Sequence, residues 1–301
     1  MSLLIVGSVA LDSIKTPYGE QENVLGGSAT YCSICASHFT TVRIVAVVGR
    51  DFPRQHIDLL QERRIDLAGL QVADGQTFRW KGFYTGDLNS AQTVYTHLNV
   101  FNDFAPAIPP KFKNSPYLFL ANIDPRLQHL VLKKMNRPKL VACDTMNFWI
   151  KNSAKDLKKL LKEIDLFFIN DAEARQLAGE VNLLACAKFI FSLGPKKIII
   201  KRGDSGAILF DQKEGTCYAP AHLLSSLKDP TGAGDTFAGG CMGYLSRTGN
   251  LTWGGFRRAL IQGTVMASFC VEDFGPGRIA RLTPEDFKKR RTDYRASVVQ
   301  W

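Results

Sequence analysis

The sequence predicts an α/β protein with a doubly wound, mainly parallel sheet that is flanked by helices. Short apolar runs alternate with amphipathic stretches along most of the 301 residues. That order generates strand–helix–strand units with right-handed crossovers. The runs are also almost continuously apolar, as expected for strands whose two faces are both covered.

The expected elements follow one another in a regular order. The apolar runs predict strands at 3–9, 42–49, 116–122, 139–144, 166–170 and 196–203. The amphipathic stretches predict helices at 26–38, 53–63, 125–135, 153–163, 171–192, 234–248 and 252–271. A chain of this length can bury one large core, and no repeat or low-complexity segment divides it. We therefore expect residues 1–301 to form a single domain.

Two segments depart from this alternation. Residues 77–101 are rich in Thr, Tyr, Phe, Trp and Val around a central "GDLNS", which is typical of a β-hairpin. Residues 13–25 alternate polar and apolar side chains around a glycine turn. We expect the two segments to form a small β-sheet that stands off the main domain as a lid.

Composition limits the classes of partner. A formal charge of +10 favours anionic partners in general. The basic runs at Lys155–Lys162 and Lys288–Arg291 lack interleaved aromatic residues, so we interpret them as solvated helix faces and expect no nucleic acid partner. No apolar stretch approaches the roughly 18 residues that span a membrane. Without a signal peptide, and with seven cysteines mostly in apolar surroundings, the chain is expected to be cytoplasmic.

Polar residues or glycine follow several of the expected strands. They are Asp12, Asn122, Asp144, Asn170 and Gly203. The carboxyl ends of parallel strands meet at one edge of the sheet, and ligands bind there near a switch in strand order. Because residues at such loop positions seldom serve packing, we expect the functional site at this edge.

The stretch "DPTGAGDTFAGG" at 229–240 carries the most specific chemistry. Gly232, Ala233 and Gly234 expose backbone N–H groups at the start of a helix, a common way to bind phosphate oxygens. Asp235 could take the proton of an alcohol that attacks a phosphoryl group. Alternatively, Asp235 only caps the helix, where a negative charge is favourable.

The whole pattern D-x-T-G-A-G-D-T-F is similar to the C-terminal signature of the PfkB (ribokinase-like) family of carbohydrate and nucleoside kinases. The resemblance continues along the chain. Gly26–Gly27 resembles the family's di-glycine element, "NDAEA" at 170–174 its N-x-x-E motif, and "KRGDSGAILF" at 201–210 its strand–glycine–strand segment. Together these motifs cover essentially the whole chain.

The resemblance implies a ribokinase-like fold and a role for each matching residue. In the catalytic centre, Asp235 would be the base and the backbone of Gly232, Ala233 and Gly234 the anion hole. The substrate would meet Asp12, Gly26, Gly27 and Asn122. The nucleotide would meet Lys201, Gly203, Gly206, Thr231 and Gly234. The implied cofactors are ATP and Mg²⁺, the latter placed by Asn170 and Glu173, mainly through water.

Several of these residues also have purely structural interpretations. Glu173 lies in the first turn of a predicted helix, where an acidic side chain favours the helix dipole. Asp12 could cap a local turn, and Gly26–Gly27 could permit close packing. Asp144 could contact a metal-bound water. In the lid, Phe83, Tyr95, Leu98 and Asn99 are expected over the substrate, or else on the buried face of the small sheet.

The sequence thus predicts an ATP-dependent kinase that phosphorylates a hydroxyl group of a sugar. A nucleoside is the alternative acceptor, because Trp80, Phe83 and Tyr95 would suit stacking on a base. A different class is a ligand-binding or regulatory protein that kept the fold without turnover, although Asp235, Asn170 and Glu173 favour an enzyme. Lids of this kind often pair between subunits, so the resemblance also allows a homodimer.

Overall fold

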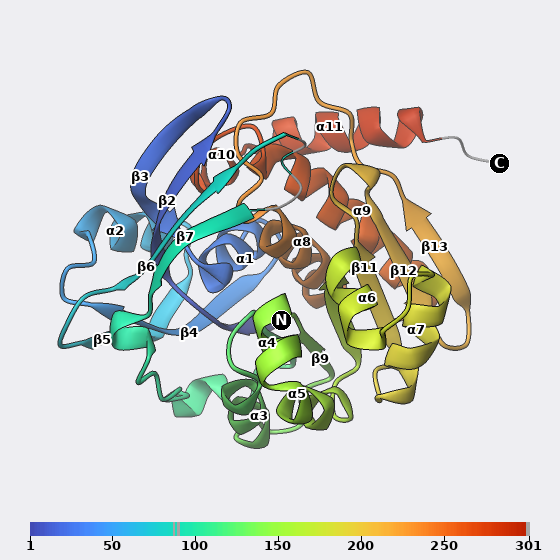
Figure 1. Cartoon of the computed structure of the whole chain (residues 1–301), viewed down its shortest axis with the longest axis horizontal. Coiled ribbons are helices and arrows are strands. Elements are labelled where there is room, and N and C mark those ends of the chain that lie inside the picture. The colour runs from blue at the N-terminus through green and yellow to red at the C-terminus, as the bar shows by residue number, and fades with distance from the viewer. Residues whose placement is uncertain (87, 89–90, 299–301) are drawn as a thin grey trace.

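The computed structural model describes residues 1–86, 88 and 91–298, which form two sheets and the helices around them (Figure 1). The main sheet has nine strands in the order β13-β12-β11-β10-β9-β8-β1-β4-β5. Their bounds are β1 Ser2–Val6, β4 Thr41–Gly49, β5 Asp66–Ala73, β8 Tyr117–Leu120, β9 Leu140–Cys143, β10 Leu166–Asn170, β11 Lys197–Lys201, β12 Ala207–Asp211 and β13 Gly215–Ala219.

The seven strands from β5 to β11 are parallel, and β12 and β13 are added antiparallel. Strand order reverses at β1, which pairs with β4 on one side and with β8 on the other. A crevice is expected beyond the carboxyl ends of the strands at such a switch. The fold therefore places the candidate site above β1 and β8.

Helices cover both faces of this sheet. Their bounds are α1 Ser28–Ala36, α2 Arg54–Glu62, α3 Pro125–Lys133, α4 Asn147–Asn152, α5 Ala154–Leu161, α6 Asp171–Ala178, α7 Leu183–Ser192, α8 Ala233–Thr248, α9 Trp253–Cys270, α10 Gly277–Ala280 and α11 Pro284–Ser297. Successive residues of β1 point to opposite faces. Leu3 and Ile5 belong to a core with residues of α1, α8 and α9, whereas Leu4 and Val6 belong to a second core with residues of α3, α5 and α7.

A second sheet has four strands in the order β3-β2-β6-β7, and we name it the lid sheet. The bounds are β2 Ala10–Thr16, β3 Gly19–Gly26, β6 Phe78–Tyr84 and β7 Ala91–His97. It lies beside α1 and α8, at the upper left of Figure 1. The expected small sheet is therefore confirmed. It begins earlier than expected, so that Asp12 lies inside β2 and not in a loop after the first strand.

Most expected elements are present, with two differences. The helix expected over 171–192 is two helices, because α6 ends before Gly179, which adopts φ 68°, and α7 begins after the capping side chain of Asn182. Strands β5, β12 and β13 and helices α4, α10 and α11 lie outside the expected ranges. Of these strands, β5 and β13 lie at sheet edges, where burial is incomplete. In the GDLNS turn, residues 87, 89 and 90 lie outside the described residues. Among the described helices, none combines the length and the apolar character that crossing a membrane requires.

Candidate active site

The site centres on the first turn of α8. Gly232 precedes the helix with φ 75°, and its Cα packs against the ring of Tyr31 so closely that a Cβ would overlap it. The N–H of Ala233, expected in the anion hole, instead donates to the carbonyl of Pro230 at 3.1 Å. The N–H groups of Gly234 and Asp235 have no hydrogen-bond partner among the described residues. The N–H of Gly232 also has no partner among the described residues, so only Ala233 of the three expected donors is occupied, and the N–H of Asp235 is an additional free donor.

Asp235 is not the cap of α8. It occupies the third position of the helix, whereas Gly232 is the N-cap residue. Within the described part of the chain, its carboxylate accepts no hydrogen bond from the helix or from another side chain. Burial and the neighbouring charge of Asp144 raise the pKa of Asp235 to about 7, although Lys201 acts in the opposite direction. A carboxylate with such a pKa is well suited to accept a proton near neutral pH.

Lys201 and Asp144 form a buried ion pair beside this helix. Lys201 ends β11, Asp144 follows β9, and β10 lies between these two strands. The ammonium nitrogen Nζ of Lys201 therefore crosses the end of β10 to reach Oδ2 of Asp144 at 2.6 Å. Their side chains are only 17% and 2% exposed. A Cβ built on Gly234 would lie 3.3 Å from the same Nζ, so the ammonium group stands against the first turn of α8.

The charges around Lys201 do not balance. Burial opposes its positive charge, but Asp144, Glu173 and Asp235 outweigh that effect and raise the pKa of Lys201 above its usual value. Burial also raises the pKa of Glu173 to about 7, in spite of Lys201. One ammonium group thus faces three carboxyl groups. The imbalance would be relieved by a further cation.

Asn170 and Glu173 form a capping box at the start of α6. The N–H of Glu173 donates to Oδ1 of Asn170 at 2.7 Å, and the N–H of Asn170 donates to Oε2 of Glu173 at 2.9 Å. The structural interpretation of both residues therefore holds. The other oxygen of Glu173 accepts no hydrogen bond from a described residue, so a second role remains open to it.

The oxygen ligands available at this site suit Mg²⁺ better than a cation that must be bound by several protein side chains at once. Across the described ranges, no cluster of three or more His, Cys, Asp and Glu side chains is arranged to hold a metal ion. Mg²⁺ usually keeps several waters and takes one or two carboxylates together with substrate phosphates. The free oxygen of Glu173, at the end of β10 beside Lys201 and Asp144, fits that coordination.

Asp12 lies on the lid side of the site. It is buried in β2, and an added Cβ at Gly26 would overlap its carboxylate, so glycine is required there by close approach. Burial and the charges of Asp229 and Asp235 raise the pKa of Asp12 to about 7. Because the charge of Asp235 contributes to this shift, the carboxyl group of Asp12 lies on the side of the lid sheet that faces the start of α8.

Strand register decides which aromatic residues of the lid face this region. Asp12 pairs with Trp80 in the parallel β2–β6 ladder, so the two side chains lie on the same face of the lid sheet. Phe83 pairs with Lys15, and Tyr95 pairs with Lys81, on the opposite face. Contrary to expectation, Phe83 and Tyr95 therefore do not share the face of the lid sheet that carries Asp12. Sequence alone could not predict which of these side chains share a face with Asp12, because that depends on which residues pair between strands.

Trp80 is oriented by two contacts within the lid sheet. Its indole lies over Gly82, where a Cβ would overlap the ring, and its Nε1–H donates to Oγ1 of Thr93 at 3.2 Å. The Cζ2–Cη2 side of the indole is thus against the strand, and the residue remains partly exposed. Leu98 is exposed, and the side-chain amide of Asn99 donates to the carbonyl of Thr77 at 2.9 Å. Asn99 therefore has a structural role within the lid.

The remaining expected residues are placed as follows. Gly27 precedes α1 and packs against the backbone of Ser8. The amide oxygen of Asn122, next to the switch point, accepts a hydrogen bond from Nε1 of Trp149 at 3.0 Å. Gly203 and Gly206 form the turn that follows Lys201. Thr231 lies beside Gly232, and its hydroxyl contacts the phenol oxygen of Tyr84 at 3.1 Å.

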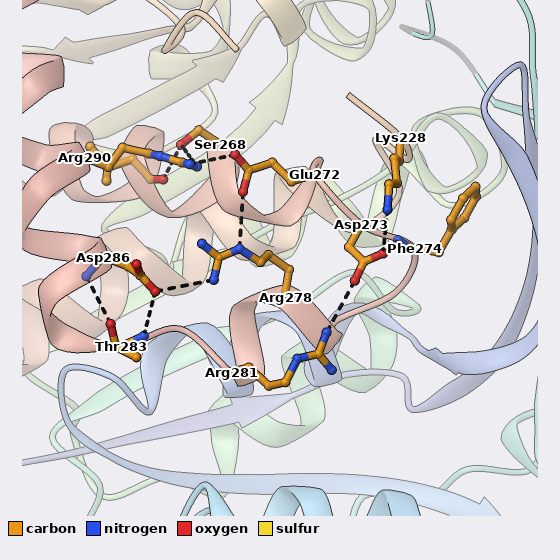
Figure 2. Close-up of polar contacts among 11 residues, drawn as sticks. Lys228, Ser268, Glu272, Asp273, Phe274, Arg278, Arg281, Thr283, Asp286 and Arg290 are labelled. Atoms are coloured by element: carbon orange, nitrogen blue, oxygen red, sulfur yellow. Dashed lines mark hydrogen bonds and ion pairs between the residues drawn. The ribbon is translucent and has the colours of Figure 1, made fainter. Parts of the chain in front are cut away.

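A charged network fixes the loop that supports residues 228–231 (Figure 2). Glu272 accepts from Arg290 at 2.6 Å and from Arg278 at 3.3 Å, and Asp273 lies 3.5 Å from Lys228. The carbonyl of Val271 accepts the N–H groups of Lys228 and Asp229. The network therefore holds the segment that leads into the first turn of α8.

The sequence did not predict the Lys201–Asp144 pair or the contact between Tyr84 and Thr231. Asp144 was recognisable as a polar residue after a strand, but its partner comes from a strand two positions away in the sheet. Tyr84 was indistinguishable from the other aromatic residues of the hairpin. Both contacts depend on the fold and not on local spacing.

The chain matches known proteins across nearly its whole length. The family model described as pfkB family carbohydrate kinase matches residues 2–281. A cytidine kinase of Thermococcus kodakarensis is 25% identical over 251 residues, which is 82% of this chain and 89% of that protein.

Solved structures resemble the fold equally well. The nucleoside kinase of Methanocaldococcus jannaschii, described as an archaeal member of the ribokinase family, superposes with a TM-score of 0.79 over 97% of this chain and 98% of its own, at 20% identity. The nucleoside kinase of Burkholderia thailandensis in complex with ADP-inosine also has a TM-score of 0.79, over 97% and 95%, at 18% identity. At these identities the likeness concerns the fold alone, which is ribokinase-like as predicted.

Proposed function

Because the chain belongs to the pfkB family of carbohydrate kinases, and is therefore a phosphotransferase that acts on hydroxyl groups, we propose that it phosphorylates a nucleoside at the expense of ATP. The observation that carries the proposal is the juxtaposition of Asp235, the free N–H groups of α8 and Lys201 with Asp12 and Trp80 of the lid sheet. The first three would handle a phosphoryl group, and the last two would hold an acceptor.

The acceptor proposal rests on the two lid residues. Asp12 can accept hydrogen bonds from the hydroxyl groups of a sugar ring. Trp80 is partly exposed and lies on the same side of the sheet, and a base stacked on its ring would gain about 1–3 kcal/mol. The relatives named cytidine kinase and nucleoside kinase support this choice. A free sugar, the acceptor that the sequence alone favours, is the second candidate because Asp12 would serve it equally.

The proposed reaction is an in-line transfer. The acceptor oxygen forms a bond to the terminal phosphorus of ATP, the bond from that phosphorus to the bridging oxygen breaks, and ADP leaves. The hydroxyl proton passes to Asp235. The N–H groups of Gly234 and Asp235 and the ammonium group of Lys201 stabilise the negative charge on the transferred group without reorganisation. Thr231 and Gly203 would border the nucleotide.

We propose that Mg²⁺ is bound near Glu173, with Asn170 orienting that side chain through the capping box. When bound, the ion would neutralise charge on the nucleotide phosphates. The buried carboxyl groups of Asp144, Glu173 and Asp235, which outnumber Lys201, favour a cation at this place.

A panel of acceptors tests the proposed function. ADP formation and the phosphorylated product are measured with cytidine, adenosine, inosine, ribose and fructose, each with and without Mg²⁺. We expect a nucleoside to give the highest kcat/KM and no turnover without the metal. Turnover of free sugars alone would replace the proposal with its second candidate. Binding without phosphorylation of any acceptor would favour a regulatory protein that kept the fold.

Replacement of Glu173 by Gln tests the metal proposal. Gln can form the same capping box, so thermal stability should be retained, whereas the loss of charge should raise the Mg²⁺ concentration for half-maximal activity by about tenfold. The matched control is Asp286→Asn, which alters the capping box of Thr283 and Asp286 at the start of α11. An unchanged Mg²⁺ requirement in Glu173→Gln would remove Glu173 from the metal site.

A further inference from the structure

Two hydroxyl groups of the lid sheet contact the segment 228–231 that leads into α8. Thr16, the last residue of β2, donates to the carbonyl of Lys228 at 2.8 Å. Tyr84, the last residue of β6, accepts from Oγ1 of Thr231 at 3.1 Å. Because β2 and β6 are parallel neighbours, their carboxyl ends reach the two ends of this short segment together.

The environment of Tyr84 keeps its phenol in the neutral, hydrogen-bonding form. Burial and the nearby charges of Asp229 and Asp12 raise its pKa well above the usual value. Tyr84 also shares its face of β6 with Trp80, since the two residues are four apart along the strand. Its side chain therefore lies on the side of the lid sheet that faces Asp12 and the first turn of α8.

Thr231 is also held by hydrogen bonds other than the one to Tyr84. Its N–H donates to Oδ1 of Asp229 at 2.8 Å, and its carbonyl accepts from Sγ of Cys270 at 3.5 Å. The next residue is Gly232, whose positive φ turns the chain into α8. Any group that holds the Thr231 hydroxyl thus acts one residue away from the turn that presents the phosphate-binding N–H groups.

We propose that Tyr84 is a positioning residue that couples closure of the lid sheet to the phosphoryl-transfer site through Thr231. The inference rests on the proposed function. While the hydrogen bond between Tyr84 and Thr231 is intact, the lid excludes water and the acceptor lies between Asp12 and Asp235. When that hydrogen bond is broken, a water oxygen can attack the terminal phosphorus instead, which releases ADP and inorganic phosphate without a phosphorylated acceptor.

The test compares Tyr84→Phe with Tyr95→Phe. Both remove one phenol oxygen from the lid sheet, but Tyr95 lies on the opposite face, where its ring packs against His97 at a tilt of 39°. We measure ADP and phosphorylated acceptor in the same reaction. Loss of one hydrogen bond corresponds to a factor of about five, so Tyr84→Phe should raise the ratio of ADP to product and lower kcat/KM by about that factor. Tyr95→Phe should match the wild type.

A ratio of ADP to phosphorylated acceptor near one in Tyr84→Phe would overturn the proposed coupling, even if kcat/KM fell. A merely structural defect would lower activity without releasing ADP by hydrolysis. A double-mutant cycle with Thr231→Val provides a second criterion. The effect of Tyr84→Phe on the ratio should disappear in the Thr231→Val background. Full additivity of the two substitutions would also contradict the proposal.

Hydrogen exchange separates this inference from the proposed function, since it needs no substrate. Amides of β6 and β7 should exchange about fivefold faster in Tyr84→Phe than in the wild type or in Tyr95→Phe. Equal exchange in the three proteins would overturn the role of Tyr84 in the lid. If the wild type phosphorylates no acceptor, the proposed function fails, while this exchange comparison still decides whether Tyr84 holds the lid.

Discussion

Replacement of Asp235 by Asn should lower kcat by about 10³-fold and leave thermal stability unchanged or slightly higher. A positioned general base contributes about 10²–10⁴-fold to the rate, and the amide cannot accept the proton of the acceptor hydroxyl. The carboxylate of Asp235 makes no hydrogen bond to the described residues that the substitution would break.

The expected effect on stability follows from the sign of the pKa shift. Burial raises the pKa of Asp235 in the folded protein to about 7, well above the usual value for an aspartate side chain. The folded state therefore favours the protonated form, so this carboxyl group costs stability progressively as pH rises from 3.8, the usual pKa, to about 7, and the full cost applies above pH 7. Because Asn removes that charge, it should not destabilise the fold. A marked fall in melting temperature would instead support a structural cap.

The same shift predicts the pH dependence of the wild type. The active form of Asp235 is the carboxylate, so activity should fall as pH drops through about 7. The residual activity of Asp235→Asn should lack this dependence on residue 235. If the activity of the wild type and of Asp235→Asn fell equally at acid pH, the titrating group would be another one, such as Asp12.

Replacement of Lys201 by Met should lower kcat by about 10²-fold and also destabilise the protein. Loss of one preorganised charge-stabilising group typically costs about 10²–10³-fold in rate. Removal of one partner from a buried ion pair leaves the other charge uncompensated, which costs about 3 kcal/mol. Asp144, with its side chain only 2% exposed, would be that uncompensated charge.

The opposite end of the same strand offers a matched control. Lys197 lies at the start of β11 and pairs with Asp211 at 2.9 Å, with side chains that are 20% and 5% exposed. Lys197→Met should therefore lose comparable stability but keep kcat. The double variant Lys201→Met/Asp144→Asn should recover stability without recovering activity. Full activity in either Lys201 variant would exclude Lys201 from the phosphoryl-transfer site.

The parts of the site that depend on local sequence could be predicted. The glycine turn before α8 and Asp235 are adjacent in sequence, and Asn170 and Glu173 are three residues apart, so each motif already determines its own local geometry. Even there the backbone adds a correction, because the N–H of Ala233 is occupied by Pro230. Propensity and spacing do not reveal which carbonyl a turn brings close.

The parts that depend on register and strand order could not be predicted. Lys201 reaches Asp144 only because the strand order of the main sheet places β11 and β9 on either side of β10. Trp80 faces Asp12, while Phe83 faces away, because β2 and β6 pair with this register and not with one shifted by a residue. Aromatic character alone favoured Trp80, Phe83 and Tyr95 equally.

The most direct test of the proposed reaction is a structure of Asp235→Asn with a non-hydrolysable ATP analogue, Mg²⁺ and the preferred acceptor. The proposed mechanism predicts the acceptor hydroxyl within about 3 Å of the side chain of residue 235, with the terminal phosphoryl group on the N–H of Gly234 and beside Lys201. An acceptor hydroxyl remote from residue 235, or a terminal phosphoryl group bound away from the start of α8, would contradict it.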